Sequence, residues 1–304
     1  MRSYTFGVFP PSWNFSTKPA SPEYNRLPMS RCVKKVPLRY PGGKQRFLEY
    51  LAPLLPAPSS IKGQFIEPFV GGGSVFFSFG FENAVLSDVN QELIDLYRGL
   101  RYSPRLVWKK FKEFPTTKRG YYLIRNTDTS DHNLVSRAAR TLFLNRTCFK
   151  GMWRHNAKGH FNVGYGGQSR RWVIAEKDLC VFARQLRTAS IRAGDFEEVI
   201  DEAGKGDFLY LDPPYKPGKK EIRHGHYVHA KFTFEDHERL AKGLHRASKR
   251  GARWLLTTSA HPSIRALLPK NFIYPLRTGV GSLPGIIRNR SSEVLVANYE
   301  QQPP

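Results

Sequence analysis

Cysteine is scarce in this chain: among 304 residues there are only Cys32, Cys148 and Cys180. Three scattered cysteines exclude a disulfide framework and a thiolate metal site, so a reducing cytoplasm is the expected compartment. Long apolar runs are also missing. No stretch approaches the roughly 18 apolar residues that cross a membrane, and residues 1–26 lack the apolar core of a signal peptide. We therefore expect no membrane partner.

Acidic residues are in short supply as well, with 25 Asp and Glu against 48 Lys and Arg, a net charge of +23. This excess favours a polyanionic partner, although a generally basic surface would give the same total. The distribution of the basic residues along the chain distinguishes these two explanations. Residues 101–160 hold 14 Lys or Arg and three acids, mixed with Tyr, Trp and Phe. Such a mixture suits phosphate contact combined with base stacking, which predicts a nucleic-acid partner.

What the chain does have is a repeated pattern of short apolar stretches that run into a turn or an acid. Residues 1–36, rich in Pro and Ser, are predicted to be an irregular extension, with Met29 as an alternative start to Met1. Five later stretches are predicted strands: QFIEPFV, AVLS, ASIRAG, FLYL and RWLLTTSA. Strands alternating with helical segments predict an α/β domain with a mostly parallel sheet.

Residues 101–190 interrupt this alternation. They contain a helical stretch, VSRAARTLFL, followed by NRTCFKGMWRHNAKGHFNVGYGGQSRR, which is dense in Gly, Asn, Arg and aromatic residues. We therefore predict a module inserted into an α/β domain that comprises residues 37–100 and 191–304.

Ligands of parallel sheets bind beyond the carboxyl ends of the strands, and acids follow several of the predicted strands. The turn FVGGGS, with Gly71 and Gly73, lets a ligand approach the backbone, although tight helix packing would also explain it. It lacks the spacing of a P-loop. Asp88 is placed either to accept hydrogen bonds from ribose hydroxyls or to cap a helix. Taken together, the turn and Asp88 favour a nucleoside-type ligand.

The stretch FLYLDPPY ends a predicted strand in Asp212, followed by Pro213, Pro214 and Tyr215. The two prolines fix their own φ angles and hold the carboxylate and nearby carbonyls in one geometry. Acceptors held beside an aromatic face suit an exocyclic amine on a planar base. Two acceptors that bind the amine hydrogens would free its lone pair for attack.

In these motifs the chain resembles the Dam-type adenine-N6 DNA methyltransferases. The resemblance covers roughly Val36 to Tyr299 and rests on motifs that occur in order: RYPGGK, FIEPFVGGGS, LSDVN, NRTCFKGMWRHNAKGHFNVGYG, GDF, DPPY and RNRSSEVLVANY. DPPY alone occurs in several amino-methylating families, whereas the ordered set is highly specific.

The resemblance implies a Rossmann-like methyltransferase sheet, with residues 101–190 as an inserted, mostly helical target-recognition module. It implies S-adenosylmethionine as methyl donor, no metal, and a flipped adenine in double-stranded DNA as substrate. Asp212, Pro213, Pro214 and Tyr215 would be catalytic. The residues implied in cofactor binding are Tyr40, Lys44, Phe69, Gly71, Gly73, Asp88, Asp195, Phe196 and Asp212.

The same resemblance implies a DNA-reading hairpin within the module. Phe149 would insert into the base stack and Arg154 would read a base, while Arg146 and Lys158 would hold phosphates. Lys150 stands where members that read GATC usually have asparagine, and Gly164 replaces a proline, so GATC is doubtful as the target. His224, His226 and His229 are expected in a basic loop over the flipped base rather than in a metal site.

Three other interpretations remain open: an RNA amino-methyltransferase, a cytosine-N4 enzyme, and a catalytically silent DNA-binding relative. Serine in place of Asp212 would have favoured the cytosine enzyme, and binding alone does not need Lys44, Asp88, Asp212 and Tyr215. The recognition sequence, a restriction partner, a phage or bacterial source and the oligomeric state are not determined by the sequence, and we expect a monomer.

Overall fold

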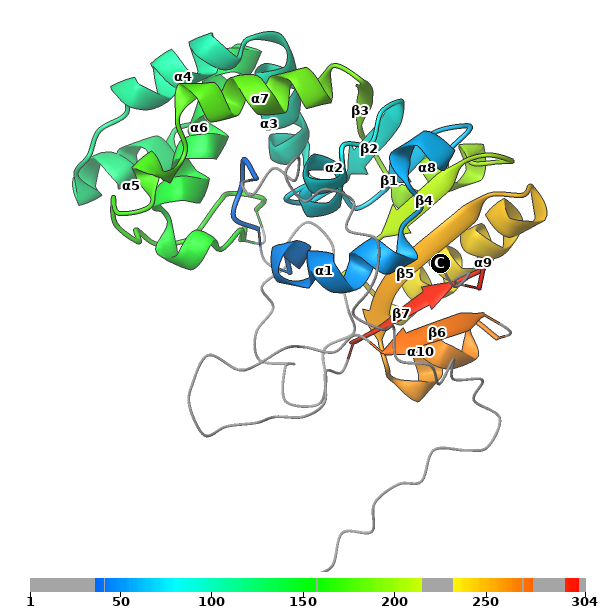
Figure 1. Cartoon of the computed structure of the whole chain (residues 1–304). Helices are drawn as coiled ribbons and strands as arrows, with labels where there is room; N and C mark the ends of the chain where they lie inside the picture. The colour runs from blue at the N-terminus through cyan, green and yellow to red at the C-terminus, as the bar shows by residue number, and fades with distance from the viewer. Residues whose placement is uncertain are drawn as a thin grey trace, which may run out of the picture.

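A seven-stranded sheet forms the centre of the molecule (Figure 1). The computed structural model describes residues 36–40, 42–156, 158–214, 232–269, 271–275 and 293–300. The strands are β1 (Phe65–Glu67), β2 (Ala84–Asp88), β3 (Ala189–Ala193), β4 (Phe208–Leu211), β5 (Arg253–Ser259), β6 (Phe272–Pro275) and β7 (Glu293–Ala297). Their order across the sheet is β3-β2-β1-β4-β5-β7-β6.

The first five strands pair in parallel, and β7 pairs antiparallel with both β5 and β6. The prediction of an α/β fold with a mostly parallel, Rossmann-like sheet is therefore confirmed. Each of the five predicted strands is present. The antiparallel pair β6–β7 was not predicted, because FIYP is short and ends in proline, a residue that is depleted in strands.

Alternating side chains of the strands enter two apolar cores on opposite faces of the sheet. In β4, Phe208 and Tyr210 belong to one core, and Leu209 and Leu211 belong to the other. This alternation follows from the two-residue repeat of a strand. Both faces are covered, which is why these strands are nearly continuous runs of apolar residues.

The helices are α1 (Leu48–Leu51), α2 (Ser74–Phe79), α3 (Gln91–Tyr102), α4 (Pro104–Glu113), α5 (Lys118–Asn126), α6 (Leu134–Thr147), α7 (Glu176–Leu186), α8 (Phe196–Glu202), α9 (Phe234–Lys249) and α10 (Pro262–Ala266). Short 3₁₀ segments occupy Lys44–Phe47, Ala52–Leu54, Pro58–Ser60, Phe149–Gly151 and Arg171–Val173. Side chains of Asn90, Asn133 and Thr233 cap α3, α6 and α9 by accepting hydrogen bonds from free backbone N–H groups. None of the described helices is long and apolar enough to cross a membrane.

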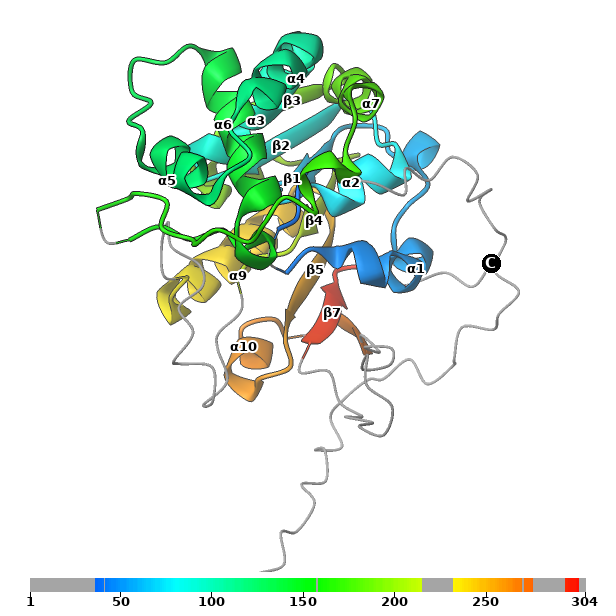
Figure 2. The ribbon, with the colours of Figure 1, turned by 90° about the vertical axis from the view of Figure 1, so that its left-hand side faces the viewer.

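Helices α3 to α7 form a group beside the sheet, with α6 packed against α3 and α4 (Figures 1 and 2). One apolar core runs from this group onto the sheet, since it contains Phe111 and Phe143 as well as Phe65 and Phe208. The predicted boundaries at residues 100 and 190 fall inside α3 and β3. Residues 101–190 as a distinct module therefore remain a prediction.

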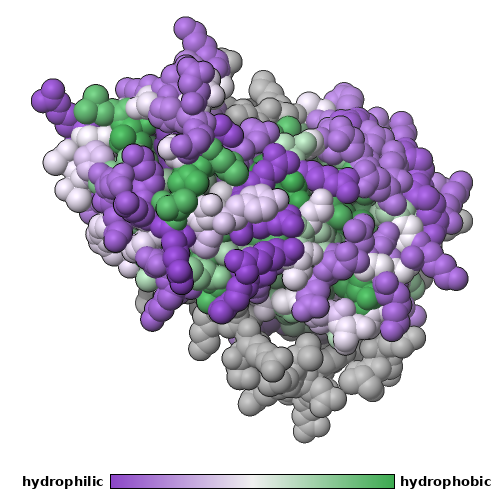
Figure 3. Space-filling model, turned by 90° about the horizontal axis from the view of Figure 1, so that it is seen from above, coloured by the Kyte–Doolittle hydropathy of each residue, from purple (hydrophilic) through white to green (hydrophobic). Residues whose placement is uncertain are grey.

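The outer surface is mostly hydrophilic. Seen from above, polar residues cover most of the molecule, and hydrophobic groups gather mainly over the helical side (Figure 3). Trp172 and Leu106 are among the exposed apolar residues of that group, at 52% and 56% exposure.

Arg171 is a fully buried arginine that joins the end of α4 to the segment before α7. Its guanidinium donates to the carbonyls of Phe111 and Phe114 at 2.8 and 2.7 Å, and to that of Pro115 at 3.0 Å. It also lies over the rings of Phe111 and Phe143. The last carbonyls of a helix lack partners within the helix, and Arg171 supplies donors for them.

Methionine in place of Arg171 retains an unbranched apolar stem but lacks the guanidinium that donates these hydrogen bonds. We expect Arg171→Met to lower the free energy of unfolding by about 2–4 kcal/mol, because several buried carbonyls lose their partners. Urea denaturation measures the change, with Arg184→Met, at an exposed position of α7, as the matched control expected within about 0.5 kcal/mol of wild type. Equal losses in both variants would contradict the assignment.

Candidate active site

Acidic residues end four neighbouring strands and therefore meet at one edge of the sheet. Glu67 and Asp88 are the last residues of β1 and β2, Asp212 directly follows β4, and Asp195 follows β3. The sheet order β3-β2-β1-β4 makes these strand ends neighbours. Glu67 was missed by the sequence analysis, although FIE followed by a turn is the same strand-then-acid pattern that identified the others.

The glycine turn lies between Glu67 and α2 and packs against Tyr40. Gly71 and Gly73 have φ angles of 45° and 65°, which other residues rarely adopt. A Cβ on Gly71 would lie 3.0 Å from the ring of Tyr40. The buried hydroxyl of Tyr97 donates to the Gly71 carbonyl at 2.5 Å. The turn is thus held from both sides, and Tyr97 is a second residue that the sequence analysis missed.

Asp88 links the glycine turn to the start of α3. Its carboxylate accepts hydrogen bonds from the backbone N–H groups of Gly71 and Asn90, each at 2.9 Å. Burial raises the pKa of Asp88 to about 6, and these two hydrogen bonds lower it only in part. The side chain that caps α3 is Asn90, which accepts from the N–H of Glu92. The alternative interpretation of Asp88 as the helix cap therefore does not hold.

Lys44 and Asp212 form a buried ion pair at the end of β4. The Lys44 Nζ lies 2.8 Å from Asp212 Oδ1 and 3.1 Å from the carbonyl of Gly42. Lys44 is only 3% exposed, whereas the Asp212 side chain keeps 18% of its surface in solvent. Pro213 is buried and Pro214 half-buried. Tyr215 lies outside the described residues, as do the histidines at 224, 226 and 229.

Glu67 lies beside these groups with 2% exposure. Burial, followed by the negative charges of Asp212 and Asp88, raises its pKa well above the usual value. The environment of Glu67 therefore favours its neutral, protonated form. Within the described part of the chain, its Oε2 has no hydrogen-bond partner. A neutral carboxyl can donate as well as accept, so Glu67 has hydrogen-bonding capacity left for a ligand at this edge.

Three aromatic rings gather next to the glycine turn. Phe69 and Phe196 lie with their ring centroids 5.2 Å apart, and Phe232, which was not predicted, contacts both rings. Asp195 caps α8 by accepting from the N–H of Glu197 and also pairs with Arg239 at 2.8 Å. The predicted pair Asp195–Phe196 thus lies at the start of α8, with the ring facing Phe69.

The segment after α6 folds back on itself, as the implied hairpin requires. Antiparallel bridges join Cys148 to Tyr165 and His155 to Phe161. Side chains alternate along it: Trp153 and His155 are buried, while Arg154 between them is partly exposed. The buried side fixes the hairpin on the apolar core and leaves the other side for a partner.

The predicted DNA-contacting residues of this hairpin reach the surface. Phe149 is 49% exposed, and the Lys150 ammonium lies 5.3 Å from its ring centroid. Lys150 adopts a left-handed conformation with a φ of 53°, which costs a lysine about 1 kcal/mol and suits asparagine better. Arg154 is oriented by a 2.8 Å hydrogen bond from its Nε to Asn162, and Lys158 is exposed.

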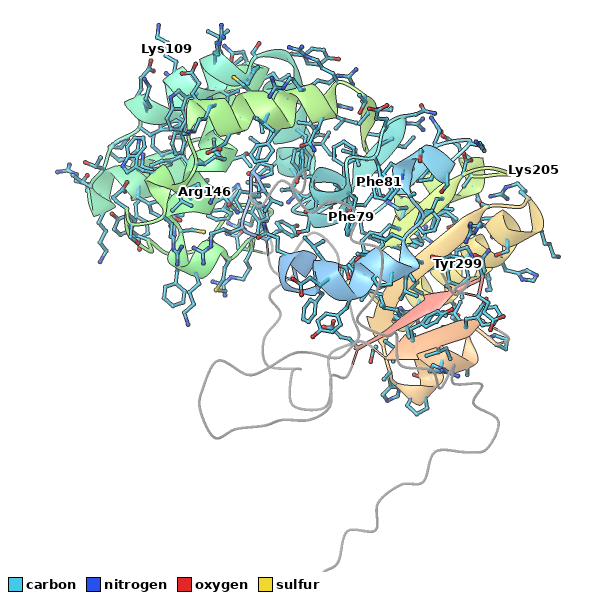
Figure 4. All side chains as sticks on the ribbon, in the orientation of Figure 1. Phe79, Phe81, Lys109, Arg146, Lys205 and Tyr299 are labelled. Carbon is cyan, nitrogen blue, oxygen red and sulfur yellow. The ribbon has the colours of Figure 1, made fainter. Side chains whose placement is uncertain are left out.

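Arg146 differs from these residues because it is buried. It retains 6% exposure and donates from Nη2 to the carbonyls of Val36 and Pro37. Figure 4 places Arg146 within the helical group, whereas Lys109 projects from its outer edge. The expected phosphate contact would need an accessible guanidinium, which this position does not offer.

The described residues contain no group of three or more His, Cys, Asp or Glu that could hold a metal ion. At the sheet edge Asp212 pairs with Lys44, Asp88 accepts from backbone N–H groups, and Asp195 pairs with Arg239. An edge of this kind suits an organic ligand that carries hydroxyl groups and both charges.

Comparison with known proteins agrees with this arrangement. The family model of the D12 class N6 adenine-specific DNA methyltransferases matches residues 40–278. A type II methyltransferase of Lactococcus lactis subsp. cremoris, M1.LlaDCHI, is 31% identical over 270 residues, which is 86% of this chain and 94% of that protein. The type II methyltransferase M.MjaIII of Methanocaldococcus jannaschii is 35% identical over 73% of this chain and 83% of its own length.

A DNA N-6-adenine-methyltransferase of Escherichia phage P1 is 37% identical over 234 residues. This match covers 75% of the present chain but 30% of the phage protein, which is much longer. The family model and the nearly full-length match to the Lactococcus enzyme decide the assignment. With its strand-end acids, its glycine turn and its DPPY sequence, the chain belongs to the D12 class N6 adenine-specific DNA methyltransferases.

Proposed function

We propose that this protein methylates N6 of an adenine within one short sequence of double-stranded DNA, with S-adenosylmethionine as methyl donor. The observation that carries the proposal is the edge at which Asp88, Glu67 and Asp212 meet Lys44 beside the glycine turn. The donor, when bound, supplies a methyl group on a positively charged sulfur. The chain itself would position the two reactants and stabilise the charge that develops on the amine.

The residues at the edge fit such a donor part by part. Asp88 would accept from the ribose hydroxyls, and Phe69 with Phe196 would flank the adenine, as the predicted role of Asp195–Phe196 suggests. Lys44 and Asp212 now neutralise each other at 2.8 Å. A methionyl group carries a carboxylate and an ammonium, so Lys44 can pair with the first and Asp212 with the second. Tyr40 would cover the turn at which the ligand approaches.

The target adenine would be flipped out of the duplex at a cost of a few kcal/mol. Asp212 and the carbonyl of Pro213 would accept the two N6 hydrogens, which frees the nitrogen lone pair for attack. Pro213 is buried and cannot donate, so its neighbourhood offers acceptors. Tyr215, beyond the described residues, would stack on the base.

The hairpin would read the sequence. Phe149 is an exposed aromatic ring suited to insertion into the base stack, and Arg154 is oriented to contact a guanine edge. Lys158 would hold a phosphate. Lys150 replaces the asparagine of GATC readers in a strained conformation, so we propose a target other than GATC.

Asp212→Ala tests the catalytic assignment. We expect methyl incorporation into duplex DNA, mapped at base resolution, to fall by at least about 10²-fold because the acceptor for the amine is lost. Asp131→Asn, at an exposed position, is the control and should behave as wild type. A folded, donor-binding wild type that methylates structured RNA rather than DNA would refute the DNA substrate.

The pH dependence of donor binding tests Asp88. Because its pKa is about 6, Asp88 is ionised above pH 6 and protonated below it. Ribose hydroxyls donate more strongly to the ionised form. Donor affinity, measured by calorimetry from pH 5 to 8, should therefore fall as the pH drops through 6. Asp88→Asn should bind more weakly and flatten this part of the profile; an unchanged profile would contradict the role.

Arg154→Ala and Lys158→Ala separate base reading from phosphate contact. We expect Arg154→Ala to cost about 1–3 kcal/mol of discrimination at one base pair. Lys158→Ala should instead weaken binding to all sequences alike and reduce the slope of log K against log salt by about 1. Methylation of a randomised duplex library together with salt titrations measures both effects. Retained discrimination in Arg154→Ala would exclude it as the reading residue.

A further inference from the structure

Two residues at the end of α6 hold the segment that leads to Tyr40. Asn145 accepts from the Arg39 N–H at 2.9 Å and donates to the Arg39 carbonyl at 2.6 Å, so it pairs with this backbone as a neighbouring strand would. Arg146 donates to the carbonyls of Val36 and Pro37 at 3.2 and 2.7 Å. Together they bind the backbone of residues 36–39, which are more than 100 positions away in the sequence.

The far side of the same segment forms part of the proposed donor site. Tyr40 packs on the glycine turn, where a Cβ on Gly71 would lie 3.0 Å from its ring. Lys44 follows within the next turn and pairs with Asp212. Residues 36–40 therefore lie between the end of α6 and the groups that the donor would contact.

The DNA-reading loop contacts this segment as well. Phe149 and Lys150 lie just beyond Cys148, the residue that follows α6, and Gly151 has a φ of 68°. A Cβ on Gly151 would lie 2.8 Å from the Cβ of Arg39, so the loop lies directly against the segment. One short piece of backbone thus has the reading loop on one side and the donor site on the other.

Burying the charged guanidinium of Arg146 costs free energy of desolvation, so its hydrogen bonds must provide something in return. Burial, reinforced by the positive charge of Arg39, lowers the pKa of Arg146 to about 10. An apolar side chain at this position would avoid that cost but would leave the carbonyls of Val36 and Pro37 without these donors. Retaining a guanidinium here makes sense where its two hydrogen bonds are needed to hold the backbone of residues 36–37 in one place.

We propose that Asn145 and Arg146 are positioning residues for the methyl donor. They hold residues 36–40 so that Tyr40 and Lys44 are in place before the donor arrives, and they tie this segment to the reading loop. Arg146 acts through the chain and not on a DNA phosphate. The inference rests on the proposed function, because it takes Tyr40 and Lys44 as donor contacts.

The experiment compares three arginine variants in the full chain. Arg146→Met should bind S-adenosylmethionine about 10-fold more weakly, as expected when supporting contacts of a site are lost, with an unchanged salt slope for DNA. Arg146→Lys, which can still donate, should recover part of the affinity. Arg171→Met removes another buried arginine that donates to backbone carbonyls. It should lower the unfolding midpoint and leave donor affinity unchanged.

Calorimetry is done below the unfolding midpoint of each variant, with circular dichroism to show that the protein is folded. Asn145→Asp, which keeps the acceptor and loses the donor to Arg39, serves where Arg146→Met does not fold and should weaken donor binding several-fold. Wild-type donor affinity in Arg146→Met or Asn145→Asp overturns the inference, and a salt slope reduced by about 1 in Arg146→Met overturns it in favour of phosphate contact. A wild type that does not bind the donor refutes the proposed function itself.

Discussion

Hydrogen bonding of β1 to its two parallel neighbours determines where Glu67, Asp88 and Asp212 lie. Phe65 pairs with Ala84 of β2 and with Phe208 of β4, so the carboxyl ends of the three strands lie at the same edge. A shift of register would move Glu67, Asp88 and Asp212 apart and reverse the faces of their strands. The apolar cores on both sides of the sheet hold that register.

Bringing these acids together has an electrostatic cost that the structure offsets locally. Burial raises the pKa of Glu67, Asp88 accepts hydrogen bonds from two backbone N–H groups, and Asp212 pairs with Lys44. In each case a ligand could replace the present partner: it could bind the Glu67 carboxyl, accept or donate hydrogen bonds at Asp88, or pair with Asp212 in place of Lys44. Raised carboxyl pKa values and a buried ion pair at one edge of the sheet are typical of functional sites, which supports the proposed donor site.

The helical group is joined to the sheet by a shared apolar core and by buried polar contacts. Among the latter, His155 of the hairpin lies 2.8 Å from Glu92, at the start of α3 and close to Asp88 in the chain. Arg140 of α6 contacts the same carboxylate at 3.2 Å. The hairpin proposed to read DNA is therefore attached to α3 and α6 by polar contacts, and α3 begins three residues after Asp88 of the proposed donor site.

The strands, the glycine turn, Asp88 and Asp212 could be predicted from the sequence because each depends on a local pattern: an apolar run, glycines, or an acid at the end of a strand. Local patterns also carried the family resemblance. The short antiparallel pair β6–β7 could not be predicted, because its strands depend on neighbours distant in the chain more than on their own composition.

Only the tertiary structure determined the burial of Arg146 and the raised pKa of Glu67. In the sequence Arg146 is one of many basic residues beside an aromatic loop, and its burial depends on carbonyls at positions 36 and 37. The pKa of Glu67 is raised because burial and the carboxylates of Asp212 and Asp88 act on it together. Exposure and pKa depend on what surrounds a side chain in space, so the sequence determined which groups are available and the fold determined their state.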